Sequence, residues 1–405
     1  MFRFVSTLIA LVLMLALAVP TSACGHKTPE AILFGCALTL SGKYAETGRL
    51  VRYGYELWME KVNSRGGISV GGEKHQVNIL YYDDESSPDR TALYVRKLII
   101  TDKVDFLLGP YGSASTLEAA RVAEEYGVPM VQGGGAADGI FSSGFTCTFG
   151  LLNTASDYFG TLLHGATSLS PRPNKVAIVS ADDDFSQTAA KGAKELAEQL
   201  GFNVLPIVTF LNDQGLSAKL EDLKWDHPDM VLLSSHFPEA LTFMTSAKGV
   251  DLNPSMYGIA VAPADPGFIE ALGQDANYVF GTAQWLPSLP YSGKSFGSAE
   301  EYALAYEDEF GVEPDYHSAA ATACGLAFQF AIEQAGSLSR EDVRQALASL
   351  DVQTFYGQLK FDETGRDSFN PMVALQVQDG KIVAVWPDAL ATAKPLYPTP
   401  PWDQR

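Results

Sequence analysis

The chain lacks most of the residue patterns on which enzymes depend. Its 405 residues include only six histidines and four cysteines, and neither type forms a pair at metal-ligand spacing. The sequence contains no HExxH metal motif, no P-loop and no complete GxGxxG dinucleotide fingerprint. We therefore expect a protein that is not an enzyme and that needs neither a cofactor nor a metal.

Positive charge is scarce as well. The sequence has 28 Lys and Arg against 48 Asp and Glu, which gives a net charge of −20. This balance argues against nucleic acid and against an anionic membrane surface as partners. Any site for an anionic ligand must then be built locally, from helix ends and hydroxyl groups.

Long apolar runs are absent beyond the N-terminus. Arg3, the apolar segment 8–19 and the small residues that follow it predict a secretory signal over residues 1–23. Cys24 follows in a context that resembles a bacterial lipobox, so we expect lipidation there and a tether over 24–30, with a freely secreted form as the alternative. The protein should lie outside the cytoplasm, in the periplasm or at the outer face of the cytoplasmic membrane, and should touch a membrane only through that anchor.

The other cysteines are Cys36, Cys147 and Cys324, all in apolar surroundings. Buried free thiols are the default expectation for such residues, and one disulfide among them is the alternative.

The rest of the chain is organised around residues 104–139. An apolar strand leads into Gly109-Pro110-Tyr111-Gly112, a helix begins at Ser113-Ala114-Ser115-Thr116, and a second strand opens into a glycine run at 133–135. A helix start rich in hydroxyls carries free N–H groups and about half a positive charge, which suits a carboxylate. The alternative is that the serines only cap the helix and the glycines only turn the chain.

Strands and helices alternate along most of the chain. The spacing predicts parallel strands joined by right-handed crossovers, first over residues 31–150 and again over 151–284. In such sheets ligands bind outside the carboxyl ends of the strands.

Several segments together resemble the type I periplasmic binding proteins of ABC transporters, in the branch of the leucine/isoleucine/valine-binding proteins. The segments that carry the resemblance are LTLSGKYAETG, NSRGGI, LYYDDESSP, KVDFLLGPYGSAST, YGVPMVQGGG, AFQFAIEQAGSLSREDVRQALASLD and TFYGQLKFDETG. The resemblance implies an α/β fold of two Rossmann-like, doubly wound lobes joined by a three-stranded hinge. The predicted boundaries are 31–150 and 285–353 for the first lobe, 151–284 and 362–390 for the second, 354–361 for the third crossing and 391–405 for a loose tail.

The resemblance also implies which residues meet a ligand. In the family, backbone and hydroxyl groups of the first lobe hold a ligand carboxylate, and the second lobe closes over it. The candidate ligand-binding residues carried over in this way are Tyr44, Thr47, Tyr111, Ser113, Ala114, Ser115, Gly134, Gly135, Ala136, Phe185, His236, Phe237 and His317. For Phe185 and Phe237 the alternative is ordinary lobe core, and for His236 and His317 it is a helix cap or a hinge hydrogen bond.

One departure from the family pattern concerns the ligand. Amino-acid binders of the family usually offer a carboxylate from the second lobe to the ligand ammonium, near the strand predicted at 255–259. Here no acid follows that strand until Asp265, and an unpaired buried ammonium is costly. Asp183, Asp184 and Asp265 are the candidate substitutes.

The sequence thus predicts a solute-binding protein that works with ABC transporter permease subunits and captures a small carboxylate, foremost an amino acid of the branched-chain type. Two alternatives stay open: a binder of an aromatic or other organic acid or amide, and a ligand-sensing receptor of the same fold.

Overall fold

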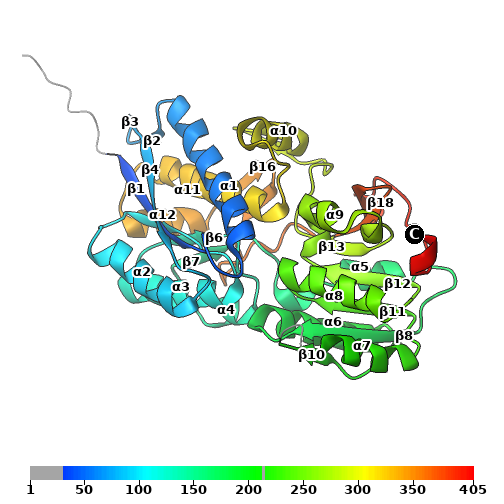
Figure 1. Ribbon diagram of the computed structural model, residues 1–405. Helices are drawn as coiled ribbons and strands as arrows, with labels where there is room; N and C mark the ends of the chain where they lie inside the picture. The colour runs from blue at the N-terminus through cyan, green and yellow to red at the C-terminus, as the bar shows by residue number, and fades with distance from the viewer. Residues whose placement is uncertain (1–30, 212–214) are drawn as a thin grey trace, which may run out of the picture.

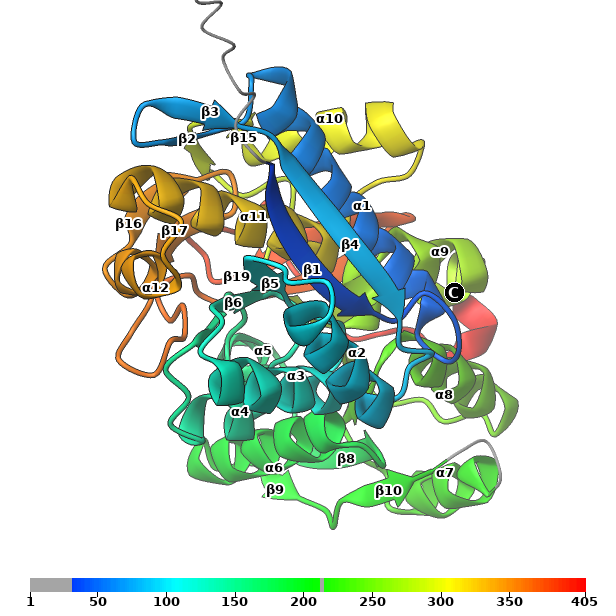
Figure 2. The same cartoon turned by 90° about the vertical axis from the view of Figure 1, so that its left-hand side faces the viewer.

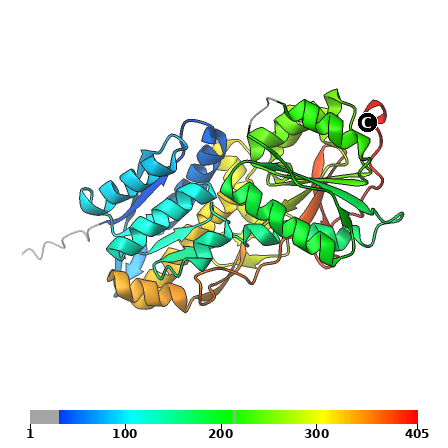
Figure 3. The same ribbon diagram turned by 90° about the horizontal axis from the view of Figure 1, so that it is seen from below.

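The computed structural model describes residues 31–211 and 215–405 and has two lobes that lie side by side (Figure 1). Each lobe is a sheet with helices on both faces, as the view from below shows (Figure 3). The predicted signal at 1–23, Cys24 and the tether at 24–30 lie outside the described residues. Within the described ranges, no helix combines the length and the apolar character that crossing a membrane requires.

The first lobe is built on a five-stranded sheet in the order β4-β1-β5-β6-β7, with all pairs parallel. β1 is buried along nearly its whole length, as expected for a parallel strand covered on both faces. The strands are β1 (Ile32–Leu38), β4 (Val77–Asp83), β5 (Phe106–Leu108), β6 (Met130–Gln132) and β7 (Thr148–Gly150), with a small hairpin of β2 (Ile68–Val70) and β3 (Glu73–His75) at one end.

Helices from two parts of the chain cover this sheet. α2 and α3 pack on one face, and α1 packs on the other together with α11 from the returning chain (Figure 2). Gly54 in α1 permits that contact, because a Cβ there would lie 2.2 Å from the carbonyl oxygen of Ser318 in α11. The helices are α1 (Ala45–Ser64), α2 (Pro88–Ile100), α3 (Ser113–Tyr126), α4 (Asp138–Ser142), α10 (Ala299–Phe310), α11 (Tyr316–Ala335) and α12 (Arg340–Ala348).

The second lobe has an eight-stranded sheet in which two antiparallel strands extend a parallel set. The parallel strands are β8 (Lys175–Ala181), β9 (Asn203–Val204), β10 (Val208–Phe210), β11 (Met230–Ser234), β12 (Met256–Ala260) and β13 (Phe280–Ala283), and the added pair is β18 (Val373–Gln378) and β19 (Lys381–Trp386). The helices are α5 (Gly160–Ala166), α6 (Asp184–Gln199), α7 (Leu216–Trp225), α8 (Phe237–Gly249) and α9 (Pro266–Leu272).

Three crossings join the lobes, and their side chains hold them together. Asn153 in the first crossing donates hydrogen bonds to Gln284 Oε1 in the second, at 3.1 Å from its backbone N and 2.9 Å from Nδ2. The same Nδ2 lies 2.9 Å from the carbonyl oxygen of Asn370 in the third. One half-buried amide, that of Asn153, therefore links all three segments at the hinge.

The third crossing is not where the sequence predicted it. Instead of crossing, residues 354–361 belong mostly to a hairpin of β16 (Asp351–Thr354) and β17 (Gly357–Lys360). Gly357 makes the turn with a φ of +117°, a conformation that glycine adopts without steric cost. The chain passes to the second lobe over residues 361–372 instead. A second small hairpin, β14 (Ser292–Gly293) with β15 (Gly297–Ser298), lies in the connection before α10.

The first crossing leads into a 3-10 turn at Ala155–Asp157 and then α5. One further expectation about local structure was wrong. The tail at 391–405 is packed rather than loose, because the indole of Trp402 is buried and its N–H donates to the carbonyl oxygen of Leu252 at 2.8 Å. The free-thiol expectation is confirmed for Cys36, Cys147 and Cys324, which are buried and unpaired, so the alternative of a disulfide among them is wrong.

Candidate functional site

The start of α3 is built as the sequence predicted, but its hydroxyl groups are already engaged. Gly112 precedes the helix with a φ of +88°, and Ser113 opens it in a buried position. Ser113 Oγ accepts the backbone N–H groups of Ala136 and Ala137 at 3.1 and 3.0 Å. The hydroxyl therefore fastens the loop after β6 to the start of α3, and its own proton is left to donate.

The backbone N–H groups of the glycine loop after β6 are likewise already hydrogen-bonded, to a side chain of the same segment. The N–H groups of Gly134 and Gly135 donate to Gln132 Oε1 at 3.1 and 2.7 Å. A Cβ on Gly134 would lie 2.3 Å from the carbonyl oxygen of Pro110, so this position requires glycine. The loop is held rigidly beside the helix start, and its N–H groups are not free.

The remaining residues of this segment point in different directions. Ser115 Oγ lies 3.0 Å from the hydroxyl of Thr91 in α2, within the first lobe. Thr116 is fully buried, with its side chain directly against Gly135. Ala114 alone is exposed. The groups at this helix start that α3 itself does not satisfy are the N–H groups of its first turn.

Five of the predicted residues meet between the lobes in one aromatic cluster. His236, at the carboxyl end of β11, lies at its centre, with ring centroids 4.8 Å from Tyr44 and 5.1 Å from Phe185. Tyr111 from the first lobe joins His236 by a hydrogen bond of 2.9 Å from its hydroxyl to Nδ1. His317 packs edge-on against Tyr111, with a centroid distance of 5.0 Å. This inter-lobe cluster therefore contains residues that are far apart in the chain.

An acidic residue orients the central histidine. Asp183 Oδ1 lies 3.4 Å from His236 Nε2, and Asp183 also caps α6 by accepting Ser186 N at 3.0 Å. Burial alone would raise the pKa of Asp183, but the facing imidazole and the bonds from Ser186 lower it below its ordinary value. Asp183 is thus an ionised group whose charge His236 and the helix start already offset.

Two predicted residues are not among these five rings. Thr47 is buried in the first turn of α1, where its side chain bonds to Tyr111 of the cluster. Phe237 packs against the core of the second lobe, and a Cβ on Gly267 would lie 3.4 Å from its ring. Asp184, one of the candidate substitutes for the missing acid, is exposed on α6.

A cavity of about 730 Å³ has walls from both lobes, and none of the thirteen predicted ligand-binding residues lines it. It adjoins the cluster through Tyr316, whose ring centroid lies 4.0 Å from that of His317. Glu46 and Tyr316 contribute from the first lobe, Asp265 and Gly267 from the second, and Trp285 from the crossing between them. The hydroxyl of Tyr316 is buried and has no hydrogen-bond partner among the described residues. Sequence reasoning missed Glu46, Trp285 and Tyr316, because nothing in their local pattern marks them as cavity residues.

Asp265 is the unusual group in this cavity. Its Oδ1 accepts Gly267 N at 2.8 Å, and no ion pair joins its carboxylate to a Lys, Arg or His within the described ranges. Burial, with Asp315 the next largest cause, raises its pKa to about 7. The cavity therefore contains a carboxylate that would be stabilised by a positively charged group.

An irregular segment brings Asp265 to this position. At the end of β12 the chain turns through Val261, whose φ of +65° is rare for a β-branched residue. A 3-10 turn at Ala262–Ala264 follows and delivers Asp265 to the cavity wall. Such strain is typical of functional loops, and the sequence carries no signal for it.

No group of His, Cys, Asp and Glu that could hold a metal ion occurs within 31–211 or 215–405. The site instead offers hydroxyl, imidazole, carboxylate and aromatic groups around a cavity between two lobes. This arrangement is suited to binding a small polar molecule.

Comparison with known proteins agrees with this fold. A family model described as "Periplasmic binding protein" matches residues 31–381. The chain belongs to the periplasmic binding protein family. The expectations of a type I periplasmic binding protein fold and of a relationship to the leucine/isoleucine/valine-binding proteins are confirmed.

Relatives with known names bind different ligands. "Leu/Ile/Val-binding protein homolog 7" of Brucella suis is 25% identical over 408 residues, covering 95% of this chain and 99% of that one. The solved branched-chain amino acid binding protein LivJ of Streptococcus pneumoniae, in complex with isoleucine, has a TM-score of 0.76 at 20% identity and covers 91% of this chain and 100% of its own. A solute-binding protein of R. palustris, in complex with benzoate, has a TM-score of 0.74 at 21% identity, with coverages of 88% and 95%.

Proposed function

We propose that this periplasmic binding protein is the extracytoplasmic solute-binding component of an ABC importer. It captures a small amino acid, of the branched-chain type, between its two lobes and presents it to the permease subunits. It acts without catalysis, and a lipid on Cys24 keeps it at the membrane surface. The names of its relatives support the transport role.

The observation that carries the amino-acid assignment is Asp265. A half-buried carboxylate without a cationic partner is costly, and a ligand ammonium that enters the inter-lobe cavity would supply that partner. The first turn of α3 and the Ser113 hydroxyl do not line this cavity, and they would meet the ligand carboxylate only when the lobes close. Closure would then place opposite ends of a zwitterion against opposite lobes.

An aromatic acid is the second candidate. The cluster of Tyr44, Tyr111, Phe185 and His236 offers ring faces to an aromatic ligand, and the relative from R. palustris is named with benzoate. An aromatic acid has no ammonium group and would leave Asp265 unpaired, so we rank an aromatic acid below an amino acid as the ligand.

Isothermal titration calorimetry of the purified protein with leucine, isoleucine, valine and benzoate tests this assignment. We expect saturable binding of at least one of the three amino acids and a melting temperature that rises with its concentration by mass action. Binding of benzoate alone would favour the aromatic acid. If none of the four produced heat or a thermal shift, capture of these ligands would be ruled out.

A further inference from the structure

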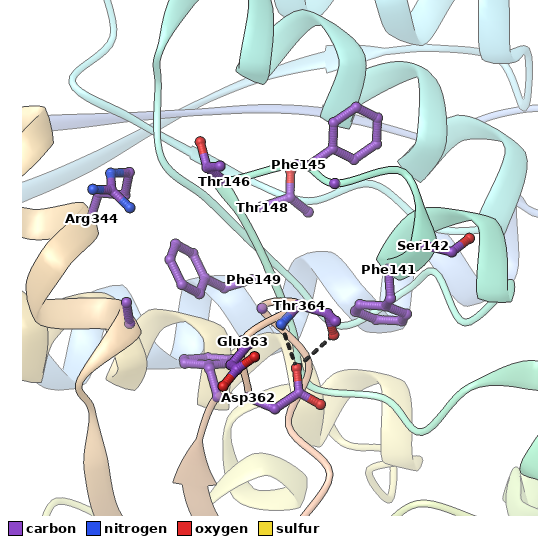
Figure 4. Close-up of a pocket in the computed structure, with 14 residues that line it drawn as sticks. Phe141, Ser142, Phe145, Thr146, Thr148, Phe149, Arg344, Asp362, Glu363 and Thr364 are labelled. Atoms are coloured by element: carbon purple, nitrogen blue, oxygen red, sulfur yellow. Dashed lines mark hydrogen bonds between the residues drawn. The ribbon is translucent and has the colours of Figure 1, made fainter.

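A second and larger cavity lies away from the inter-lobe site, on the outer side of the first lobe. Its volume is about 910 Å³, and it is lined by β7, the end of α4 with the loop after it, α12 and the third crossing at 361–365 (Figure 4). None of the thirteen residues carried over from the family lines it. We refer to it as the hinge-side cavity, because one of its walls is a connection between the lobes.

Phenylalanine rings dominate the lining of the hinge-side cavity. Phe149 and Phe361 pack edge to face at a centroid distance of 5.1 Å, and Figure 4 shows Phe141, Phe145 and Phe149 grouped around Thr148. Aromatic walls of this kind favour an aromatic guest, since ring pairs gain more than the burial of their area alone.

Thr148 gives the hinge-side cavity an unused polar group. It is only 3% exposed, and its Oγ1 has no hydrogen-bond partner within the described ranges. Buried hydroxyls are rarely left in this state, because losing the bond to water without replacement is costly. A bound molecule with a polar substituent, or a small shift of the wall as it binds, would satisfy this group.

The charges at the rim of the hinge-side cavity leave a negative surplus. Arg344 is engaged by Glu341, to which its Nε and Nη2 donate at 2.9 and 2.7 Å. Asp362 accepts Thr364 N at 2.8 Å, as the dashed line in Figure 4 shows, and forms an ion pair with Arg366 at 3.4 Å, so its charge is offset. Glu363 is exposed and has no ion pair among the described residues. A positively charged group is therefore the natural complement to this rim.

We propose that the hinge-side cavity binds a small aromatic amine. The ring packs among Phe141, Phe149 and Phe361, and the ammonium lies at Glu363. This site is separate from the amino-acid site proposed above and does not depend on it. Because residues 361–365 line the cavity and continue into the hinge, a bound amine contacts a segment that must adjust when the lobes move.

Calorimetric titration of the full chain with phenethylamine tests this proposal, with 3-phenylpropionate as the matched probe of opposite charge. We expect saturable phenethylamine binding and weaker binding of 3-phenylpropionate. Glu363→Gln should weaken phenethylamine by up to about 5-fold, as expected for a partly exposed ion pair. Because Glu363 is exposed, this variant should fold normally.

Two further variants locate the bound amine. Thr148→Val, which keeps the shape and removes the hydroxyl, should weaken phenethylamine binding, whereas Glu300→Gln, at an exposed residue of α10 that lines neither cavity, should leave it unchanged. Absence of saturable binding would overturn the proposal. So would equal binding of the two probes, or a loss of phenethylamine binding in Glu300→Gln but not in Glu363→Gln. None of these outcomes bears on whether leucine or benzoate binds between the lobes.

Discussion

Two aspartates of the second lobe occupy the same kind of position and have opposite electrostatic properties. Asp183 follows β8 and caps α6, and Asp265 follows β12 and caps α9. Asp183 faces His236, which keeps its pKa below the ordinary value, whereas burial without such a partner raises the pKa of Asp265 to about 7. One carboxylate is already paired by the protein, and the other is left for a ligand.

The comparison teaches that capping a helix does not decide whether a carboxylate is available to pair with a ligand. Both residues accept a backbone N–H from the helix that they precede. What differs is the surrounding set of charges, which comes from distant parts of the chain. Four predictions test this contrast, in order of decreasing expected effect.

The largest effect should come from removing the unpaired carboxylate. Asp265→Asn should weaken leucine binding by about 100-fold, since truncating one partner of a buried charge pair leaves the other charge uncompensated. Calorimetry measures the change, and circular dichroism checks that the variant is folded. Unchanged leucine affinity would show that the ammonium lies elsewhere.

The two aspartates should also make stability depend on pH in opposite directions. The folded chain retains a proton on Asp265 up to a pKa of about 7, whereas the unfolded chain releases it near pH 4. The free energy of unfolding should therefore fall as the pH rises from about 4 to about 7. Asp367, whose pKa burial raises to about 8, adds to this fall. The stabilisation from Asp183 is instead present above about pH 4 and lost below it.

Melting temperatures of the ligand-free protein across this pH range measure these contributions. Asp265→Asn should reduce the fall in melting temperature between about pH 4 and 7. The fall that remains in this variant should come from Asp367. An identical slope in the variant and in the unmodified protein would mean that Asp265 does not titrate in this range.

Loss of the paired carboxylate should affect the fold more than the ligand. Asp183→Asn keeps an N-cap acceptor for α6 but removes the negative charge that faces His236 and the helix start, at a cost of about 1 kcal/mol. We expect a melting temperature lower by a few degrees and a smaller loss of leucine affinity than in Asp265→Asn. If Asp183→Asn reduced leucine affinity more strongly, the roles of the two aspartates would be reversed.

The smallest effect should come from the hydrogen bond between the lobes. Tyr111→Phe removes the hydroxyl that is hydrogen-bonded to His236 Nδ1, and the loss of about 1 kcal/mol should weaken leucine binding about 5-fold by making the closed form less favourable. Tyr126→Phe is the matched control, because its hydroxyl accepts a hydrogen bond from Arg96 within the first lobe and does not line the inter-lobe cavity. Equal effects of the two substitutions would show that the bond does not contribute to closure.

The sequence predicted the regular parts of this molecule well. Buried parallel strands such as β1 and β11 are continuous apolar runs, and α3 begins at the predicted glycine and serine. These features depend on local patterns that a single chain displays directly. Tyr44 and Tyr111 follow strands of one sheet, and a general rule places such residues at the same edge. That His236 of the other sheet would meet them was implied only by the family resemblance.

What could not be predicted depends on distant contacts or unusual backbone. Asp265 reaches the cavity only through the rare conformation of Val261. The serine and glycine groups expected to bind a carboxylate are partly occupied by Gln132 and by each other, which local sequence does not reveal. The crossing predicted at 354–361 came from the family resemblance, and local sequence did not reveal that Phe355 in this hairpin packs against Trp285 and Tyr302.

The packed C-terminus has a practical consequence. The guanidinium of Arg405 lies 3.8 Å from the ring centre of Trp402, which in turn packs against Tyr257 in β12. A purification tag fused after Arg405 would begin at the surface of the second lobe and could disturb the packing of Trp402 against Tyr257. Trimming the final residues would uncover Tyr257 and lower solubility, so any label meant to follow lobe motion is better placed on an exposed helix such as α7.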